Sequence, residues 1–282
     1  MTEPVVVHAG HGLPYSKGLM AQALSASGLS PNRAFELARE IERRLVVGGT
    51  ETIEVAALRT CAEEVLLDFE GEAAVRRYRD WERLDRLDRP LVVMLGGAPG
   101  VGKSTLATRL AHRLGITRVI ATDVIRQVLR AFFTAEAMPS VHHSAFELEP
   151  AGFREQAEMV GTGVEAIVER ACAERTPVVL EGVHAVPGVL SPELEARCVT
   201  VEALLVVDSE ELHRGHFSLR GAERPAERYH ARFGEIRKLQ NQLADRARSA
   251  GVTVIDNENV DETLGWLMNL VLDSVARVEA RT

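Results

Sequence analysis

The sequence contains little cysteine, and its cysteines are scattered. Cys61, Cys172 and Cys198 lie far apart in a chain of 282 residues, and no two of them form a Cys-x-x-Cys pair. Disulfide frameworks and structural zinc sites depend on several closely spaced cysteines or histidines. The cysteine content therefore argues against both.

The sequence also lacks an excess of positive charge and any long apolar run. Its 33 lysines and arginines are outnumbered by 41 aspartates and glutamates, which gives a formal net charge of −8. A general nucleic-acid binder needs a basic surface, so we expect no nucleic-acid partner. No segment approaches the ~18 apolar residues of a membrane span, and the first residues show no signal-peptide pattern. We therefore expect no membrane partner and a cytoplasmic location.

Residues 1–88 carry mostly helical patterns and are predicted to form a small separate domain. The clearest helix start is Ser30 followed by Pro31, an N-cap residue and a residue suited to the first helical position. Strand signals are few, apart from a short valine run at residues 5–7. Helices are expected over the ranges 14–28, 30–45, 53–67 and 72–87.

Residues 89–282 alternate between short apolar runs and helical patterns. The apolar runs are residues 91–95, 118–121, 177–182, 203–208 and 252–257. Strands separated by helices are typical of a parallel sheet that is covered by helices on both faces. Because the crossovers of such units are right-handed, we predict an α/β domain with a five-stranded, doubly wound parallel sheet.

A glycine-rich turn follows the first of these strands. The segment GAPGVGKS, residues 97–104, matches the P-loop pattern G-x-x-x-x-G-K-[ST] between a strand and a helix. The N–H groups of such a turn bind phosphate oxygens at the positive end of the helix. Lys103 is expected to reach the β- and γ-phosphates of ATP, and Ser104 to bind Mg²⁺. The predicted nucleotide-binding residues are Gly97, Ala98, Pro99, Gly100, Val101, Gly102, Lys103, Ser104 and Thr105.

A P-loop alone does not distinguish a kinase from an ATPase, a GTPase or a regulatory switch. The chain has no NKxD-like guanine motif, but Asp123 and Arg126 follow the second strand, at the sheet edge where ligands bind. Arg130 shares a helix face with Arg126. Arginines suit a carboxylate or phosphate, and Asp123 is suited to orient and deprotonate an attacking hydroxyl. The alternative is a helix cap at Thr122 or Asp123 and a solvated face for both arginines.

The third strand contributes two further candidates. Glu181 ends this strand, where a carboxylate can hold a water bound to Mg²⁺, and His184 follows it at the same edge. The alternatives are a plain strand-end charge for Glu181 and a packing histidine for His184. We interpret His142 and His143 as a loop feature rather than a metal site, because no third ligand lies at a useful spacing.

An arginine-rich stretch, residues 213–243, follows the fourth strand. In small P-loop kinases this position usually holds a lid that shields the γ-phosphate from water and stabilises the transferred charge. Arg220 and Arg224, which flank Gly221 and precede Pro225, suit that role. The alternative is a solvated helix, which fits Arg232 and Arg237 better.

Together, GGAPGVGKST, TDVIRQVLR, EGVHAVPG and RYHARFGEIRKLQ make the chain resemble the 2-phosphoglycerate kinase family. The resemblance implies an N-terminal domain similar to an ATP-cone, followed by a P-loop kinase domain that phosphorylates the 3-hydroxyl of 2-phosphoglycerate and forms 2,3-diphosphoglycerate. It also implies roles for eight residues, namely nucleotide binding by Gly100, Gly102, Lys103, Ser104 and Thr105, and acceptor or magnesium binding by Asp123, Arg126 and Glu181.

The ATP-cone-like domain raises a separate question. Lys17 and Arg33 are its only early basic candidates, and no clear hairpin precedes them, so we expect a degenerate cone that serves oligomer contacts or weak regulation. A homo-oligomer is left open.

Two other functions also remain open. One is a P-loop kinase of a different small acceptor, such as a sugar acid or nucleotide sugar. The other is a non-catalytic, nucleotide-gated regulator, against which Asp123, Arg126 and the arginine-rich lid argue.

Overall fold

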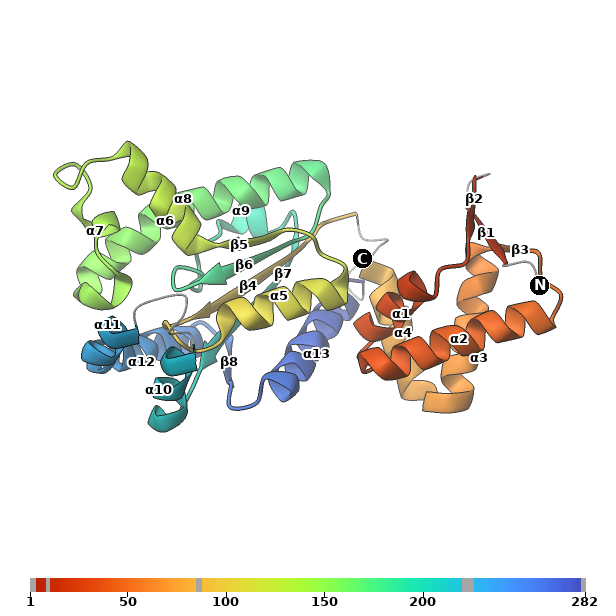
Figure 1. Ribbon diagram of the computed structural model, residues 1–282. Helices are drawn as coiled ribbons and strands as arrows, with labels where there is room; N and C mark the ends of the chain where they lie inside the picture. Colours follow the sequence, from red (N-terminus) through yellow and green to blue (C-terminus); the bar gives the residue numbers. More distant parts are fainter. Residues whose placement is uncertain (1–3, 9–10, 85–87, 220–225, 280–282) are drawn as a thin grey trace. The chain divides into compact units, whose positions relative to one another are not determined.

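The computed structural model describes residues 4–8, 11–84, 88–219 and 226–279 (Figure 1). The chain packs into two compact units, each with its own hydrophobic core. The first comprises Met1–Leu87, Arg113–Gly115 and Val275–Thr282, and the second comprises Asp88–His112 and Ile116–Ser274.

The N-terminal unit combines four helices with a small sheet. The helices are α1 (Lys17–Ala26), α2 (Pro31–Val47), α3 (Val55–Glu70) and α4 (Glu72–Leu84). Ser30 caps α2 as predicted, because its side chain accepts a hydrogen bond from the Arg33 N–H at 3.4 Å. Leu37 and Ile41 of α2 are buried in the core of this unit, together with Leu24 and Leu66.

The small sheet corrects the expectation that this unit lacks a hairpin. Strands β1 (Val5–His8) and β2 (His11–Pro14) pair antiparallel, and β3 (Thr52–Glu54) pairs parallel with β1. The residues of β2 are all exposed, so this strand leaves no alternation of apolar and polar residues in the sequence. β3 has only three residues, and the sequence pattern predicts a helix over 53–67 that includes two of them.

The second unit contains the predicted five-stranded parallel sheet. Its strands are β4 (Leu91–Gly97), β5 (Val119–Ala121), β6 (Val178–Gly182), β7 (Val199–Val206) and β8 (Thr253–Asp256), in the order β5-β6-β4-β7-β8. All neighbouring strands run parallel. Every residue of the central strand β4 is buried, which explains its continuous apolar sequence.

Helices cover both faces of this sheet (Figure 1). The long ones are α5 (Lys103–Leu114), α6 (Thr122–Phe132), α8 (Pro150–Glu174), α12 (Phe233–Ser249) and α13 (Val260–Glu279). The short ones are α7 (Pro139–His142), η1 (Ala145–Glu147), α9 (Pro192–Glu195), α10 (Glu210–Leu219) and α11 (Ala226–Ala231). Val92 and Met94 of β4 pack against Val160 and Val164 of α8, whereas Arg109 of α5 pairs with the α13 residue Asp261 at 3.2 Å.

The carboxyl ends of β4, β5 and β6 meet at one edge of the sheet because the strands are parallel. Leu95 of β4 lies opposite Glu181 of β6, and Ala121 of β5 also lies opposite Glu181. The P-loop, the start of α6 and the segment after β6 therefore emerge side by side. This edge holds most of the predicted site residues.

Candidate active site

The glycine-rich turn between β4 and α5 has the conformation that its sequence predicts. Gly100 and Gly102 have φ values of 85° and 87°, in the left-handed region that favours glycine. A Cβ atom on Gly100 would lie 2.5 Å from Cζ of Phe217, and one on Gly102 would clash with the amide of Asn257. Both positions therefore require glycine for backbone conformation and for space.

The carbonyl groups of this turn are held by side chains from several elements. The donor–acceptor pairs are Lys103 Nζ to Ala98 O at 2.7 Å, His213 Nε2 to Pro99 O at 2.8 Å, His216 Nδ1 to Gly100 O at 2.8 Å and Asn257 Nδ2 to Val101 O at 2.9 Å. Four consecutive carbonyl oxygens are thus bonded within the protein itself. The turn has its shape before any ligand binds, which is the preorganisation that an anion site needs.

The proton position on His213 follows from its neighbours. Nε2 lies against a carbonyl oxygen and must donate, while the guanidinium of Arg237 faces Nδ1 at 3.5 Å. Burial lowers the pKa of His213 to about 4, and the charge of Arg237 acts in the same direction even though the bond to Pro99 opposes it. His213 is therefore neutral near pH 7, with its proton on Nε2.

Ser104 and Glu181 form a pair of oxygen donors next to the P-loop. The Ser104 hydroxyl donates to Oε1 of Glu181 at 2.9 Å, and Glu181 is only 7 % exposed. Mg²⁺ prefers oxygen ligands and commonly takes one or two from a protein, with the rest supplied by water and phosphates. A hydroxyl and a carboxylate at hydrogen-bond distance fit that requirement.

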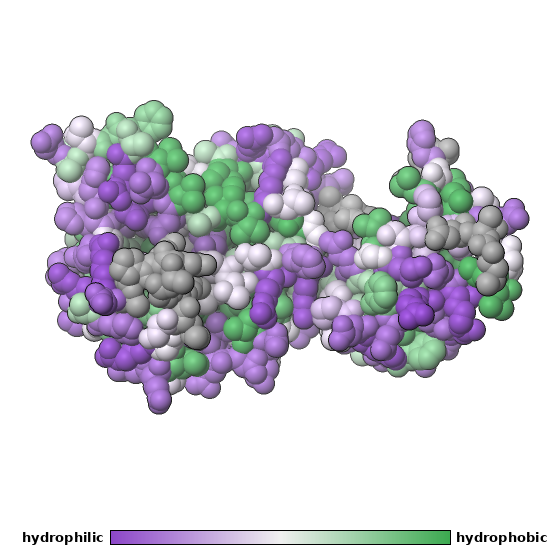
Figure 2. Space-filling view, in the orientation of Figure 1, coloured by the Kyte–Doolittle hydropathy of each residue, from purple (hydrophilic) through white to green (hydrophobic). Residues whose placement is uncertain are grey.

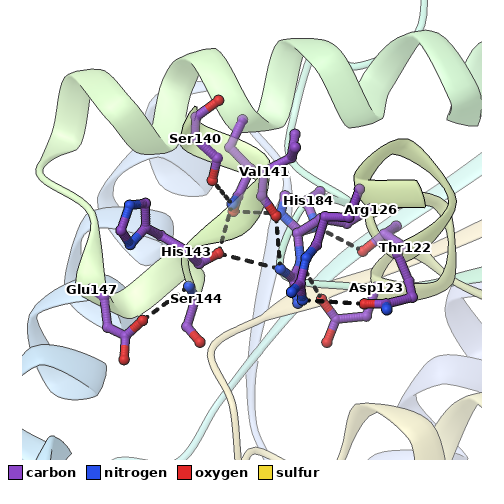
Figure 3. Close-up of polar contacts among 12 residues, drawn as sticks. Thr122, Asp123, Arg126, Ser140, Val141, His143, Ser144, Glu147 and His184 are labelled. Atoms are coloured by element: carbon purple, nitrogen blue, oxygen red, sulfur yellow. Dashed lines mark hydrogen bonds and ion pairs between the residues drawn. The ribbon is translucent and has the colours of Figure 1, made fainter. Parts of the chain in front are cut away.

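Asp123 and Arg126 project from the first turns of α6 (Figure 3). Arg126 Nε donates to Oδ1 of Asp123 at 3.1 Å, and the Asp123 side chain is 54 % exposed whereas that of Arg126 is 14 % exposed. Arg126 Nη1 also donates to the carbonyl oxygens of Val141 and His143, at 3.0 and 3.3 Å. Arg126 thus connects Asp123 to the loop that follows α7.

A buried chain of polar groups lies behind these residues. Gln156 of α8 donates its amide N–H groups to the carbonyls of Ser140 and His143, at 2.6 and 3.0 Å, so its Oε1 must accept. His184 Nε2 therefore donates to that oxygen at 2.9 Å, and His184 Nδ1 accepts from Thr122 Oγ1 at 3.1 Å. Burial lowers the pKa of His184 to about 4, so the ring is neutral.

A cavity of about 730 Å³ lies in front of this buried chain, at the edge of the sheet. The P-loop contributes Pro99, Gly100, Lys103 and Ser104, and the other polar lining residues are Asp123, Arg126, Gln127, Ser144, Glu181, Arg228 and Tyr229. Lys103 and Asp123, which are distant in sequence, therefore line the same space. A phosphate held by the P-loop and an acceptor beside Asp123 would share one enclosure.

Comparison with known proteins identifies the family of this chain. The family model described as an AAA domain matches residues 92–187. The 2-phosphoglycerate kinase of Methanopyrus kandleri strain AV19 is 35% identical to the chain, over 95% of this chain and 86% of that protein. The 2-phosphoglycerate kinase of Methanothermobacter thermautotrophicus is 36% identical, over 89% and 88%. The chain belongs to the 2-phosphoglycerate kinase family.

Among solved structures, a shikimate kinase from Acinetobacter baumannii in complex with shikimate is similar at 19% identity and a TM-score of 0.41. That similarity covers 66% of this chain and 94% of that one. Membership of the 2-phosphoglycerate kinase family thus rests on full-length sequence similarity, and it confirms the predicted P-loop kinase.

Not every predicted site residue lies in the cavity wall of this family member. Arg130 is exposed on α6, where its Nη1 donates to Gln127 at 3.3 Å, and it does not line the cavity. His184 is fully buried and lies behind the wall, bonded to Thr122 and Gln156. Gly97, Ala98, Val101, Gly102 and Thr105 also lie outside the cavity lining, so any phosphate contact from them uses the backbone or the outer surface.

Only part of the arginine-rich stretch lies within the described residues. Arg220 and Arg224 lie outside the described residues, whereas Arg228 of α11 lies within them and lines the cavity. Sequence reasoning identified the segment but did not single out Arg228. It considered Thr122 only as a helix cap, whereas α6 has no side-chain cap and Thr122 bonds to His184. It also missed Gln156, which no local motif marks, because its partners lie 13 to 28 residues away.

The described parts of the chain contain neither a membrane-spanning helix nor a cluster of metal-binding side chains. No helix there is long and apolar enough to cross a membrane. Within those same parts, His, Cys, Asp and Glu side chains do not gather in threes as a metal-binding group. His142 is the last residue of the short helix α7 rather than part of a loop, and it bonds through Nε2 to the carbonyl of Phe133 at 2.9 Å.

Proposed function

We propose that this protein transfers the γ-phosphoryl group of ATP to the 3-hydroxyl of 2-phosphoglycerate and so forms 2,3-diphosphoglycerate. The observation that carries the proposal is the shared cavity, in which the P-loop residues Lys103 and Ser104 face the same space as Asp123 and Arg126. The names of the full-length relatives supply the acceptor.

In this proposal the P-loop holds the triphosphate of ATP. The N–H groups of the turn bind phosphate oxygens, and Lys103 exchanges its contact with Ala98 O for the β- and γ-phosphates. Ser104 and Glu181 hold the magnesium ion, directly or through water, as their 2.9 Å contact favours. When bound, the ion neutralises charge that develops on the phosphate oxygens during transfer.

Asp123 has the position of the group that receives the acceptor hydroxyl. Its exposed carboxylate orients the 3-hydroxyl toward the γ-phosphate and accepts its proton, while Arg126 fixes the carboxylate through Nε. His184 acts behind the wall as a positioning residue, in place of the direct contact with substrate that the sequence suggested. We leave Arg130 out of the site because its guanidinium lies on the exposed surface of α6.

For the N-terminal unit we propose an ATP-cone-like module without a second tight nucleotide site. Its two early cations are engaged: Lys17 pairs with Glu42 at 2.7 Å, and Arg33 pairs with Glu70 at 2.6 Å and with Glu36 at 2.9 Å. Equilibrium dialysis is expected to find one ATP per chain, and two would overturn this proposal. We further propose that the enzyme works in the cytoplasm, where ATP is supplied, and that the module contributes to contacts between copies of the chain.

The decisive experiment is an ADP-release assay with ATP and Mg²⁺. The acceptors compared are 2-phosphoglycerate, 3-phosphoglycerate, D-glycerate, a sugar acid, a nucleotide sugar and none. Strong stimulation by 2-phosphoglycerate alone is expected. Stimulation by a different acceptor would support the alternative kinase, and ATP binding without stimulation by any acceptor would support the non-catalytic regulator.

A further inference from the structure

Arg228 is an arginine of the cavity wall that the proposed catalytic arrangement does not use. It projects from α11, and its side chain is 57% exposed. Its Nη2 donates to Ser144 Oγ at 2.8 Å and to Glu147 Oε1 at 2.9 Å. These contacts occupy one end of the guanidinium, and among the described residues Nε and Nη1 have no hydrogen-bond partner. The group therefore retains donors for a ligand.

Arg126, the other arginine of the wall, is committed to protein partners. Its Nε bonds to Asp123, and its Nη1 bonds to the carbonyls of Val141 and His143. The charge of Arg126 is also balanced by Asp123, whose carboxylate lines the same cavity. Arg126 thus holds α7, His143 and Asp123 in place, and among the described residues only its Nη2 has no hydrogen-bond partner.

The charge balance differs at Arg228. Its partner Glu147 does not line the cavity, so the guanidinium faces the space while its counter-charge lies behind. Glu147 stays ionised: burial works to raise its pKa, but the hydrogen bonds from Arg228 and from the Ser144 N–H outweigh burial and lower the pKa. A fixed carboxylate behind the arginine orients it without cancelling the field in the cavity.

The two arginines converge on adjacent residues of one loop. Arg126 reaches the His143 carbonyl from α6, and Arg228 reaches the Ser144 hydroxyl from α11. Tyr229 packs α11 against this region. Its ring centroid lies 5.9 Å from that of Phe146, and its ring stacks on Phe217 with 5.0 Å between the centroids. An acceptor placed beside Asp123 would therefore lie within a wall that carries Arg228.

We propose that Arg228 binds the phosphate group of the acceptor and so makes the site select a phosphorylated hydroxy acid over an unphosphorylated one. This inference rests on the proposed function, and it adds the residue that determines the substrate class. Arg228 keeps its positive charge, and the N–H donors on Nε and Nη1 remain available to phosphate oxygens, for which arginine is well suited. The phosphate, which is the more highly charged group of the acceptor, binds Arg228, whose counter-charge lies outside the cavity.

The test is calorimetric titration of the protein with 2-phosphoglycerate and, separately, with D-glycerate, in the presence of ADP and Mg²⁺. Arg228→Met keeps much of the stem and removes the charge. We expect the Kd for 2-phosphoglycerate to rise by about 10- to 100-fold, the range for loss of hydrogen bonds to a charged group. The Kd for D-glycerate, which has no phosphate, is expected to change less than about twofold, as is that for ADP. Arg130→Met on exposed α6 is the matched control and is expected to change none of these constants.

A second variant separates ligand binding from a structural role. Glu147→Gln removes the carboxylate from Arg228 but keeps an oxygen that can accept from the Ser144 N–H. Freed from Glu147, Arg228 is expected to bind 2-phosphoglycerate at least as tightly as in the wild type. If Glu147→Gln weakens binding as much as Arg228→Met does, the ion pair is merely structural and the inference is overturned. Equal weakening of 2-phosphoglycerate and D-glycerate by Arg228→Met would also overturn it.

Failure of the proposed function gives a different result. In that case the wild-type protein neither binds 2-phosphoglycerate nor turns over with it, and no variant needs to be compared. A wild type that binds and turns over, combined with an unchanged Kd in Arg228→Met, rejects only the role of Arg228.

Discussion

The two walls of the cavity are built in different ways. In the nucleotide wall, glycines shape one continuous turn, and side chains of Lys103, His213, His216 and Asn257 bond to its carbonyls. In the acceptor wall, Gln156 and Arg126 donate hydrogen bonds to the carbonyls of Ser140 and Val141 in α7. There the side chains themselves, Asp123 and Arg228, face the cavity.

The difference reflects what each wall binds. Many enzymes bind the phosphates of a nucleotide, and backbone N–H groups at the start of a helix bind these phosphates whatever the rest of the ligand is. An acceptor is recognised by groups that differ from one enzyme to another, so the recognising atoms belong to side chains. Val124 and Val128 of α6 are exposed apolar residues that also line the cavity. Apolar and hydrophilic side chains are interspersed over the surface shown in Figure 2.

The largest expected effect is at the nucleotide wall. Lys103→Ala is expected to lower kcat/KM by at least about a thousandfold, because a preorganised charge on the transferring phosphoryl group is lost. The ADP-release assay measures it, with exposed Lys238→Ala on α12 as the control. Substantial remaining turnover would reject the P-loop as the catalytic wall.

Asp123→Asn probes the acceptor wall directly. We expect kcat to fall by about 10²- to 10⁴-fold, the usual contribution of a positioned general base, while ATP binding stays unchanged. Exposed Glu136→Gln is the control for loss of a surface carboxylate. An unchanged kcat would remove Asp123 both as base and as orienting group.

Gln156→Met tests whether the buried chain of polar groups supports only the acceptor wall. It leaves the carbonyl of Ser140 without its side-chain donor and that of His143 with Arg126 alone, and unmade buried hydrogen bonds cost about 1–3 kcal/mol. We expect the KM for the acceptor to rise about 30-fold and the KM for ATP to stay within about twofold. Neighbouring Glu155→Met, exposed on α8, is the control. Equal changes in both constants would show that the walls are not separate.

A buried neutral histidine, His213 or His184, supports each wall, so acid is expected to weaken both. The pKa of each histidine in the folded protein is about 4, below its ordinary value of 6.5, so the unfolded chain takes up protons first as the pH falls. The free energy of unfolding is therefore highest above about pH 6.5 and falls toward pH 4. At pH 5 the loss is about 2 kcal/mol per histidine. Urea unfolding at pH 7.5 and pH 5 measures the difference.

His213→Gln serves as the comparison in that experiment, because its amide can donate to Pro99 O without titrating. We expect its stability to fall by about 2 kcal/mol less than that of the wild type over the same interval. An identical pH dependence in both proteins would contradict the assignment of a neutral His213.

The smallest expected effect is at His216, which donates to a single P-loop carbonyl. His216→Leu removes one hydrogen bond, worth about 1 kcal/mol, and is expected to raise the KM for ATP about fivefold without changing that for the acceptor. His216→Asn, whose amide can take the place of Nδ1–H, is expected to restore the wild-type value. A selective change in the KM for the acceptor would reverse the proposed division between the walls.

Sequence patterns predicted the strands of the second unit because each is short, apolar and followed by a helix. They failed for β2, whose four residues are all exposed, and for the three-residue β3, since neither has a periodic apolar face. Lys103, Ser104, Asp123 and Glu181, which line the cavity, were predictable because each lies near the carboxyl end of a strand or in the turn or helix that follows it, at the edge where parallel strands bind ligands.

The sequence by itself thus determined the P-loop, the parallel sheet and the carboxylates at the strand ends, because these depend on neighbours in the chain. Only the tertiary structure decided that His184 is a buried support, that Gln156 and Arg126 hold the acceptor loop, and that Arg228 faces the cavity. Those outcomes depend on contacts between residues as far as 84 positions apart. Hydrogen bonds over such separations leave no periodic signal in the sequence, because the fold alone brings the partners together.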